Sequence, residues 1–216
     1  MGEKAFHKDK RTGEIMLYDY SISDLWLASL VYANIGYWVE NLFRLFSKGI
    51  LDSRNQIFPF LFCYSIAMWA LYFALGTPKK ARFFNHRLVK DDSVHGQRLS
   101  VLCYFCISFF FIFFGEIVVG SMFENVSGIQ LWNYSGIPLH VTQYTSIPTT
   151  TALSAGVVVL MEYFFTPLMK NIQKINKNVV LKLDYILGFL IVADWLYMMI
   201  SINFFKVSPN YWSIQF

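Results

Sequence analysis

Five long apolar stretches constrain the fold of this chain more than any other feature of its sequence. They run over residues 25–46, 58–75, 99–123, 151–169 and 183–205. A helix crosses a bilayer with about 20 apolar residues, so the second stretch is short and the third is long. Only 15% of the residues are charged, whereas soluble domains carry about 25%. The sequence therefore predicts an all-α, polytopic membrane bundle of about five transmembrane helices.

The positive charges predict how this bundle is oriented. Of the eighteen lysines and arginines, four lie in residues 1–23, six in 76–98 and four in 170–182. Short loops rich in lysine and arginine stay in the cytoplasm, which places the N-terminus inside and the C-terminus outside the cell membrane. We expect a cytoplasmic basic leader over 1–23, a single transmembrane domain over 24–205 and an outer tail over 206–216.

A short motif occurs twice, at equivalent points of this topology. The first stretch ends GYWVEN (residues 36–41) and the third ends GSMFEN (residues 120–125), so both read G-x-x-x-E-N. After each copy a polar outer turn follows, and a proline, Pro59 or Pro148, opens the next span. The pattern predicts two parallel hairpin repeats plus a fifth helix. Transporters are commonly built from such internal repeats.

Several carboxylates fall within or at the ends of the apolar stretches. An acid inside a membrane is costly unless it is paired, hydrated or protonated, so each one is a candidate for function. Glu116, Gly120 and Glu124 share one helix face at 100° per residue. Glu162 and Asp194 lie deeper in their own stretches, and we predict that both turn into the bundle. Their alternative role is that of buried, hydrogen-bonded structural acids.

The connection over residues 124–150 is polar but contains no lysine or arginine. It supplies amides, hydroxyls, Trp132 and Tyr134, and the two aromatic residues are also typical of interfacial anchors. Arg44 follows Glu40 by four residues, a spacing that allows the two to pair along a helix. A shared outer site suited to a cationic or hydroxyl-rich group is predicted. Its expected ligand-binding residues are Glu40, Asn41, Arg44, Glu116, Gly120, Glu124, Asn125, Trp132, Asn133 and Tyr134.

Catalytic chemistry has weaker candidates. Glu116, Glu124 and His140 could exchange protons, with His140 as a general base beside a carboxylate, although a neutral hydrogen-bonding role suits a lone histidine better. None of the familiar catalytic sequence motifs occurs. The cysteines lie inside apolar stretches without metal-ligand partners, so packing explains them. We predict no metal site and no cofactor.

The motifs together resemble those of the bacterial CmpB-type family of ABC-transporter permeases, to which the vertebrate transmembrane protein 229 family is related. The matching elements are Gly36, Tyr37 and Glu40 in the first half, and Glu116, Gly120 and the run WNYS (residues 132–135) in the second. The resemblance covers residues 32–167, and Asn133 departs from it because an aspartate is common there. It implies a small multi-span membrane protein and carries over no substrate.

Three functions are compatible with these observations. The first is a permease-like transport or ligand-binding component for a small or lipidic molecule. The second is a membrane-embedded enzyme that performs acid/base chemistry on a lipid or isoprenoid, and the third is a structural or assembly factor. Membrane lipids are expected partners. Because five spans are few for a complete pore, we also expect a homo-oligomer, or a partner ATPase docked on the basic loop 79–98. Nucleic acid is not an expected partner, since the charges flank membrane segments.

Overall fold

The computed structural model describes residues 5–9 and 13–216, and most of these are helical. Parts of the predicted leader, residues 1–4 and 10–12, lie outside the described residues. The chain divides into two compact units, which are described separately. The first contains Leu71–Pro167 and the described residues 5–6, and the second contains the described residues of His7–Ala70 together with Leu168–Phe216.

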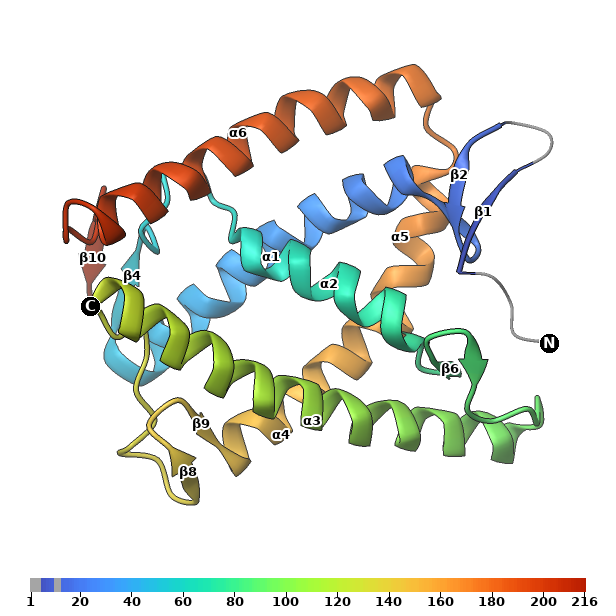
Figure 1. Cartoon of the computed structure of the whole chain (residues 1–216), viewed down its shortest axis with the longest axis horizontal. Coiled ribbons are helices and arrows are strands. Elements are labelled where there is room, and N and C mark those ends of the chain that lie inside the picture. The colour runs from blue at the N-terminus through green and yellow to red at the C-terminus, as the bar shows by residue number, and fades with distance from the viewer. Residues whose placement is uncertain (1–4, 10–12) are drawn as a thin grey trace. The chain divides into compact units, whose positions relative to one another are not determined.

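The first unit is built on α3 (Val94–Ser127), which packs against α4 (Ile147–Val159) (Figure 1). Helix α4 continues through the π-helical segment η1 (Leu160–Phe164) into α5 (Phe165–Ile172), whose last residues belong to the second unit. Before α3, the strands β5 (Gly76–Thr77), β6 (Lys80–Phe83) and β7 (His86–Arg87) form an antiparallel sheet in that order. Between α3 and α4, β8 (His140–Thr142) pairs with β9 (Thr145–Ser146). This hairpin brings the start of α4 back to α3.

The buried face of α3 is made of small and polar residues. Gly96, Ser100, Tyr104 and Ser108 are buried at a spacing of four, whereas large apolar residues such as Phe114 are exposed. Small residues let helices approach closely in membranes, where lipid covers the large apolar side chains. The helix pairing therefore has the residue pattern of a membrane protein.

The second unit contains α1 (Ile22–Lys48), which packs against α6 (Lys177–Asn203). Between them in sequence are β4 (Ile50–Asp52) and α2 (Phe62–Leu75), whose last turn belongs to the first unit. β10 (Ser213–Gln215) pairs antiparallel with β4, so the end of the chain is fixed beside the end of α1. Before α1, the short strands β1 (Phe6–Lys8), β2 (Ile15–Leu17) and β3 (Tyr20–Ser21) occur in the leader, and β2 and β3 are antiparallel.

Local sequence signals explain where the main helices begin and end. The hydroxyls of Ser21 and Ser93 accept hydrogen bonds from the first turns of α1 and α3, as N-cap residues do. Both helices end at a glycine with positive φ, Gly49 (64°) and Gly128 (73°), a conformation that favours glycine. Each of these glycines starts a turn that returns the chain to the helix it has just left.

Each of the five predicted stretches contains a helix, and three helices are long and apolar enough to cross a membrane. Within the described residues these are Val94–Ser127, Ile147–Ile172 and Lys177–Asn203. Helix α1 has 27 residues but is not among the three, and α2 is a shorter apolar helix of 14 residues. Crossing of the membrane by α1 and α2 stays a prediction, as does the orientation of the termini.

Candidate ligand-binding site on helix α3

Two carboxylates of α3 receive hydroxyl groups from the segment that enters α4. Pro148 stands in the first turn of α4, where its missing N–H costs nothing, and Ser146 caps the helix. This start fixes Thr145 and Thr150 against α3. The α3 site is defined here as Glu116, Glu124, Tyr134, Gln143, Tyr144, Thr145 and Thr150, all of which belong to the first unit.

Glu116 accepts hydrogen bonds from three hydroxyls. The Thr145 hydroxyl lies 2.7 Å from Glu116 Oε2, the Thr150 hydroxyl 3.2 Å from the same oxygen, and the Tyr134 hydroxyl 3.5 Å from Oε1. Both threonines are fully buried. Hydrogen bonds to an ionised group are stronger than those between neutral groups. These hydroxyls therefore join Glu116 to the start of α4 and to the loop after α3.

Glu124 lies two turns further along α3 and is held by Tyr144. The Tyr144 hydroxyl donates to Glu124 Oε2 over 2.7 Å, and the Gln143 amide donates to the same oxygen over 3.2 Å. The Tyr144 ring lies against Gly120, where an added Cβ would come within 2.6 Å of the ring. We call Gly120, Glu124 and Tyr144 the α3 tyrosine clamp. Its hydrogen bond to Glu124 raises the pKa of the Tyr144 phenol above its usual value, because ionisation would break that bond.

The loop after α3 positions this clamp. Trp132 donates its indole N–H to the carbonyl of Tyr144 over 2.8 Å, and the Tyr134 N–H donates to the carbonyl of Gln143 over 2.8 Å. Trp132, predicted as a ligand-binding residue or an interfacial anchor, therefore fixes the backbone of the tyrosine that contacts Glu124.

Three other predicted residues of this region are exposed. The Asn133 amide donates to the side chain of Gln130 in the same loop over 2.9 Å. Asn125 is exposed in the last turn of α3. The His140 ring lies 3.1 Å from the carbonyl of Ile137. The role of His140 as a general base stays a prediction.

The first motif copy forms a clamp of the same kind in the second unit. Tyr64 of α2 donates its hydroxyl to Glu40 Oε1 over 2.9 Å, and a Cβ added at Gly36 would overlap the Tyr64 ring. Gly36, Glu40 and Tyr64 form the α1 tyrosine clamp. In both clamps the glutamate follows the glycine by four residues. The tyrosine lies further along the chain, in α2 for Tyr64 and in the β8–β9 turn for Tyr144.

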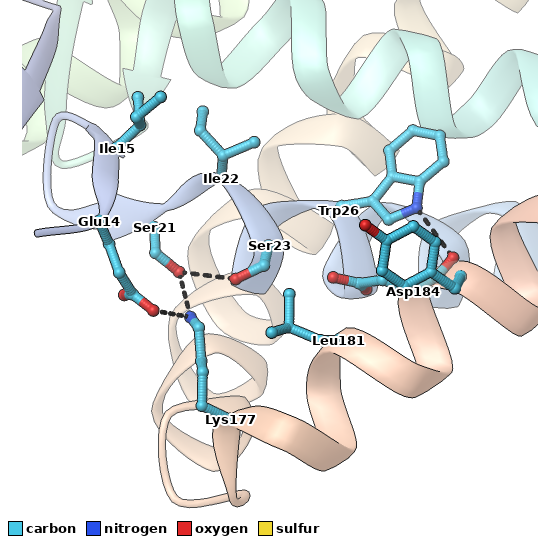
Figure 2. Close-up of a pocket in the computed structure, with 10 residues that line it drawn as sticks. Glu14, Ile15, Ser21, Ile22, Ser23, Trp26, Lys177, Leu181 and Asp184 are labelled. Carbon is cyan, nitrogen blue, oxygen red and sulfur yellow. Dashed lines mark hydrogen bonds and ion pairs between the residues drawn. The ribbon is translucent and has the colours of Figure 1, made fainter. Parts of the chain in front are cut away.

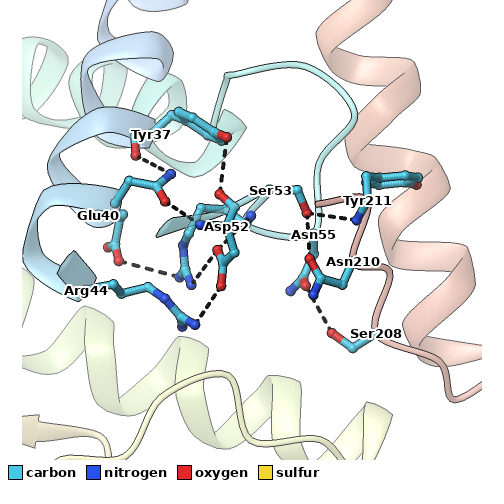
Figure 3. Close-up of polar contacts among 11 residues, drawn as sticks. Tyr37, Glu40, Arg44, Asp52, Ser53, Asn55, Ser208, Asn210 and Tyr211 are labelled. Carbon is cyan, nitrogen blue, oxygen red and sulfur yellow. Dashed lines mark hydrogen bonds and ion pairs between the residues drawn. The ribbon is translucent and has the colours of Figure 1, made fainter. Parts of the chain in front are cut away.

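The residues next to Glu40 are engaged in the turn that follows α1 (Figure 3). Asn41 is fully buried and accepts the N–H of Asp52 over 2.9 Å. Arg44 pairs with Asp52 over 2.6 Å, and Arg54 lies 3.5 Å from Glu40. The expected pair of Glu40 and Arg44 is thus replaced by two pairs that join α1 to the turn, because β4 brings Asp52 and Arg54 alongside the helix.

The two deeper acids have separate partners. Glu162 lies in the π-helical segment and pairs with Lys79 over 2.5 Å, and this hydrogen bond and the negative charge of Glu162 raise the pKa of Lys79. Asp194 is buried on α6 and accepts the backbone N–H groups of Ile57 and Phe58 over 2.9–3.0 Å. Asp194 therefore holds the segment that leads into α2.

Comparison with protein families gives one match that covers most of the chain. The model of the ABC_trans_CmpB family, described as "Putative ABC-transporter type IV", matches residues 27–199. The chain belongs to this family. The resemblance predicted from the sequence motifs is thereby confirmed, and the protein is a membrane protein of an ABC-transporter type. Searches of the curated proteins and of the solved structures gave no match.

The family match spans both clamps and the acids at Glu116, Glu162 and Asp194. Sequence reasoning proposed these acids but did not pair Tyr64 or Tyr144 with them. The available signal was the occurrence of a tyrosine at a similar distance beyond each motif glutamate, 24 and 20 residues. In the part of the chain that the structure describes, no cluster of histidine, cysteine and acidic residues has the makings of a metal site.

Proposed function

We propose that this protein is a permease-like component of a transporter, and that its α3 site binds a small cationic or hydroxyl-rich molecule at the outer membrane interface. The observation that carries the proposal is Glu116, an acid in the apolar helix α3 that two buried threonine hydroxyls and Tyr134 contact. An ionisable residue inside a membrane helix is costly, so it is by default a candidate for a functional site. Membership of an ABC-transporter family supports the transport assignment.

In this proposal the five apolar stretches all cross the membrane as one domain, with the leader inside and the tail outside. The charge distribution supports this orientation. The two tyrosine clamps support the two-hairpin repeat, since each unit has a glycine that seats a tyrosine ring and a glutamate that accepts its hydroxyl. Glu40, Asn41 and Arg44 belong to the outer end of the first repeat and complete the proposed ligand-binding region.

A separate ATPase is the expected partner, because we find no nucleotide-binding motif in the sequence. The basic loop 79–98 is its proposed docking surface. Lys80, Lys90 and Arg98 are exposed there, whereas Lys79 pairs with Glu162 and Arg87 pairs with Asp92. The exposed cations are those available to an acidic partner surface or to anionic lipid.

The test is the set of small molecules that remain bound to the purified protein. We expect mass spectrometry of the wild type to detect a co-purifying polar compound that Glu116→Gln loses, while Gly115→Ala on the same helix retains it. Gly115 has no atom within 4 Å of an added Cβ, so this control leaves the site unchanged. Identical bound compounds in Glu116→Gln, Glu124→Gln and the wild type would contradict a ligand site on α3.

A structural role is the second candidate, and the clamps favour it. Glu40 and Glu124 both accept a tyrosine hydroxyl, and Asp194 accepts two backbone N–H groups, so these acids already hold their segments in place. If this is their whole function, the glutamine variants lower the thermal midpoint without changing any bound compound. The same mass-spectrometric comparison therefore separates the two candidates.

A further inference from the structure

A pocket of about 430 Å³ opens between the starts of α1 and α6 in the second unit (Figure 2). Its polar lining comes from Glu14, Ser21, Lys177 and Asp184, and its aromatic lining from Trp26 and Tyr185. The volume falls within the range of small-molecule sites, roughly 300–1,000 Å³. This pocket lies outside the α3 site, and the proposed function makes no use of it.

Lys177 does not offer its charge to a ligand in this pocket. Its ammonium lies 2.7 Å from the Ser21 hydroxyl, 2.9 Å from Asp24 and 3.1 Å from Glu14. An ammonium has three N–H donors, so these three acceptors use all of them. Figure 2 shows the Lys177 side chain directed toward Ser21 and Glu14. An anionic ligand therefore gains little here.

Asp184 differs from Lys177 because one of its side-chain oxygens has no hydrogen-bond partner. It is 9% exposed, and its Oδ1 is a buried oxygen without a hydrogen-bond partner. Trp26 donates its indole N–H over 3.4 Å to the backbone carbonyl of Asp184, which leaves the carboxylate oxygen unsatisfied. Buried polar atoms without partners are rare in folded proteins, and each one calls for an explanation. A donor supplied by a ligand satisfies this oxygen.

The aromatic residues beside Asp184 suit a cationic donor. Trp26 and Tyr185 both line the pocket, and aromatic rings attract an ammonium through their negative faces. The Tyr185 side chain is 78% exposed, so its ring is open to an incoming group. A carboxylate flanked by aromatic rings thus favours an organic ammonium over a neutral or anionic group.

An apolar pocket shares a wall with this one. It measures about 320 Å³ and is lined by Trp26, Phe62, Ser65, Ile66 and Trp69. Trp26 therefore lines both the pocket that contains Asp184 and the neighbouring apolar pocket. A ligand with an ammonium head and a hydrocarbon tail fits this combination.

We propose that the pocket between α1 and α6 binds the primary ammonium group of an amphiphile, with Asp184 as the acceptor and Trp26 and Tyr185 as its aromatic walls. The ammonium of an ethanolamine phospholipid has this chemistry, and so does a free small amine. The neighbouring apolar pocket favours the lipid, because it offers room for an acyl chain.

The experiment is native mass spectrometry of the full-length protein with added phosphatidylethanolamine, phosphatidylcholine or phosphatidylglycerol. We expect phosphatidylethanolamine to be retained preferentially, since choline has no N–H to donate and phosphatidylglycerol has no cation. Asp184→Asn should weaken its retention about tenfold or more, the effect of losing one charged hydrogen bond. Asp19→Asn, which removes an exposed carboxylate of the β2–β3 turn, is the matched control and should bind as the wild type does.

A second variant guards against a folding defect in Asp184→Asn. Tyr185→Leu removes an exposed ring, so the fold should persist while retention of phosphatidylethanolamine falls about threefold. Displacement of the lipid by added ethanolamine would identify the amine alone as sufficient, and absence of displacement would identify the whole lipid as the ligand. Equal retention of the three lipids, preference for phosphatidylglycerol, or wild-type retention by both pocket variants would overturn the proposal.

Discussion

At the scale of single residues, the contact between Gly120 and Tyr144 determines how Glu124 is presented. The ring can rest on α3 only because Gly120 has no side chain, and from this position its hydroxyl reaches Glu124 at 2.7 Å. The α1 clamp repeats the chemistry with Gly36, Tyr64 and Glu40. A glycine in a helix interior costs about 1 kcal/mol relative to alanine, so its presence here is explained by the ring that it admits.

Replacement of Gly120 by alanine should therefore destabilise the protein, although alanine is the better helix former. We expect a loss of about 1–3 kcal/mol, the usual effect of overpacking, because the new Cβ would meet the Tyr144 ring. Thermal unfolding in detergent measures it. Gly115→Ala on the same helix meets no atom within 4 Å and should leave the midpoint unchanged or raise it. A midpoint for Gly120→Ala equal to that of Gly115→Ala would show that the ring does not rest on α3.

The hydrogen bond of the Tyr144 phenol makes its contribution to stability depend on pH. Its hydrogen bond to Glu124 raises its pKa above the usual value of 10.0, so the bond stabilises the fold fully below that pH. The stabilisation is lost as the pH rises through the higher, folded-state pKa. The difference in phenolate absorbance between the wild type and Tyr144→Phe should titrate above pH 10. A difference that titrates at or below pH 10 would mean that Tyr144 does not donate to Glu124.

At the scale of elements, buried and half-buried acids hold loops onto helices. Asp194 of α6 accepts the N–H groups of Ile57 and Phe58, which precede α2, and Arg44 and Asp52 join α1 to β4. Glu162 pairs with Lys79 from the π-helical segment that separates α4 from α5. A π-helical turn is often found at functional sites. Here the π-helical segment contains Glu162, the acid that pairs with Lys79 of the basic loop.

Truncation of Asp194 tests its role at this scale. Asp194→Ala leaves two backbone N–H groups without their acceptor, so we expect a loss of about 2–3 kcal/mol in stability and faster proteolysis before α2. Asp194→Asn keeps an acceptor oxygen and should lose less. Limited proteolysis and thermal unfolding provide the measurements. Equal stability of Asp194→Ala and the wild type would show that this segment is held by other contacts.

The sequence predicted the helices better than it predicted the partners of their polar residues. Apolar length located all five helical segments, because the period and the length of such runs depend on local sequence alone. It also placed Glu116, Gly120 and Glu124 on one face. It did not pair Arg44 with Asp52, nor Tyr144 with Glu124, because these contacts depend on how a turn returns to its helix. The motif alone also gave no sign of the pocket beside Asp184, which combines residues from the β2–β3 region, α1 and α6.

At the scale of the whole molecule, the family match and three apolar helices describe a membrane protein of an ABC-transporter type. Buried small polar residues and exposed large apolar ones on α3 agree with this class. We propose that the loop after α3, which positions the α3 site, faces the outside. The side of the membrane on which this loop lies does not depend on which molecule binds.

Labelling of intact cells with a membrane-impermeant maleimide shows on which side of the membrane this loop lies. In a variant with Cys63, Cys103 and Cys106 replaced by serine, single cysteines are introduced at the exposed positions Ser135 and Lys90. We expect Ser135→Cys to be labelled in intact cells, and Lys90→Cys to be labelled only after the cells are opened. Labelling of Lys90→Cys in intact cells, with Ser135→Cys protected, would place the α3 site on the cytoplasmic side and contradict the proposed orientation.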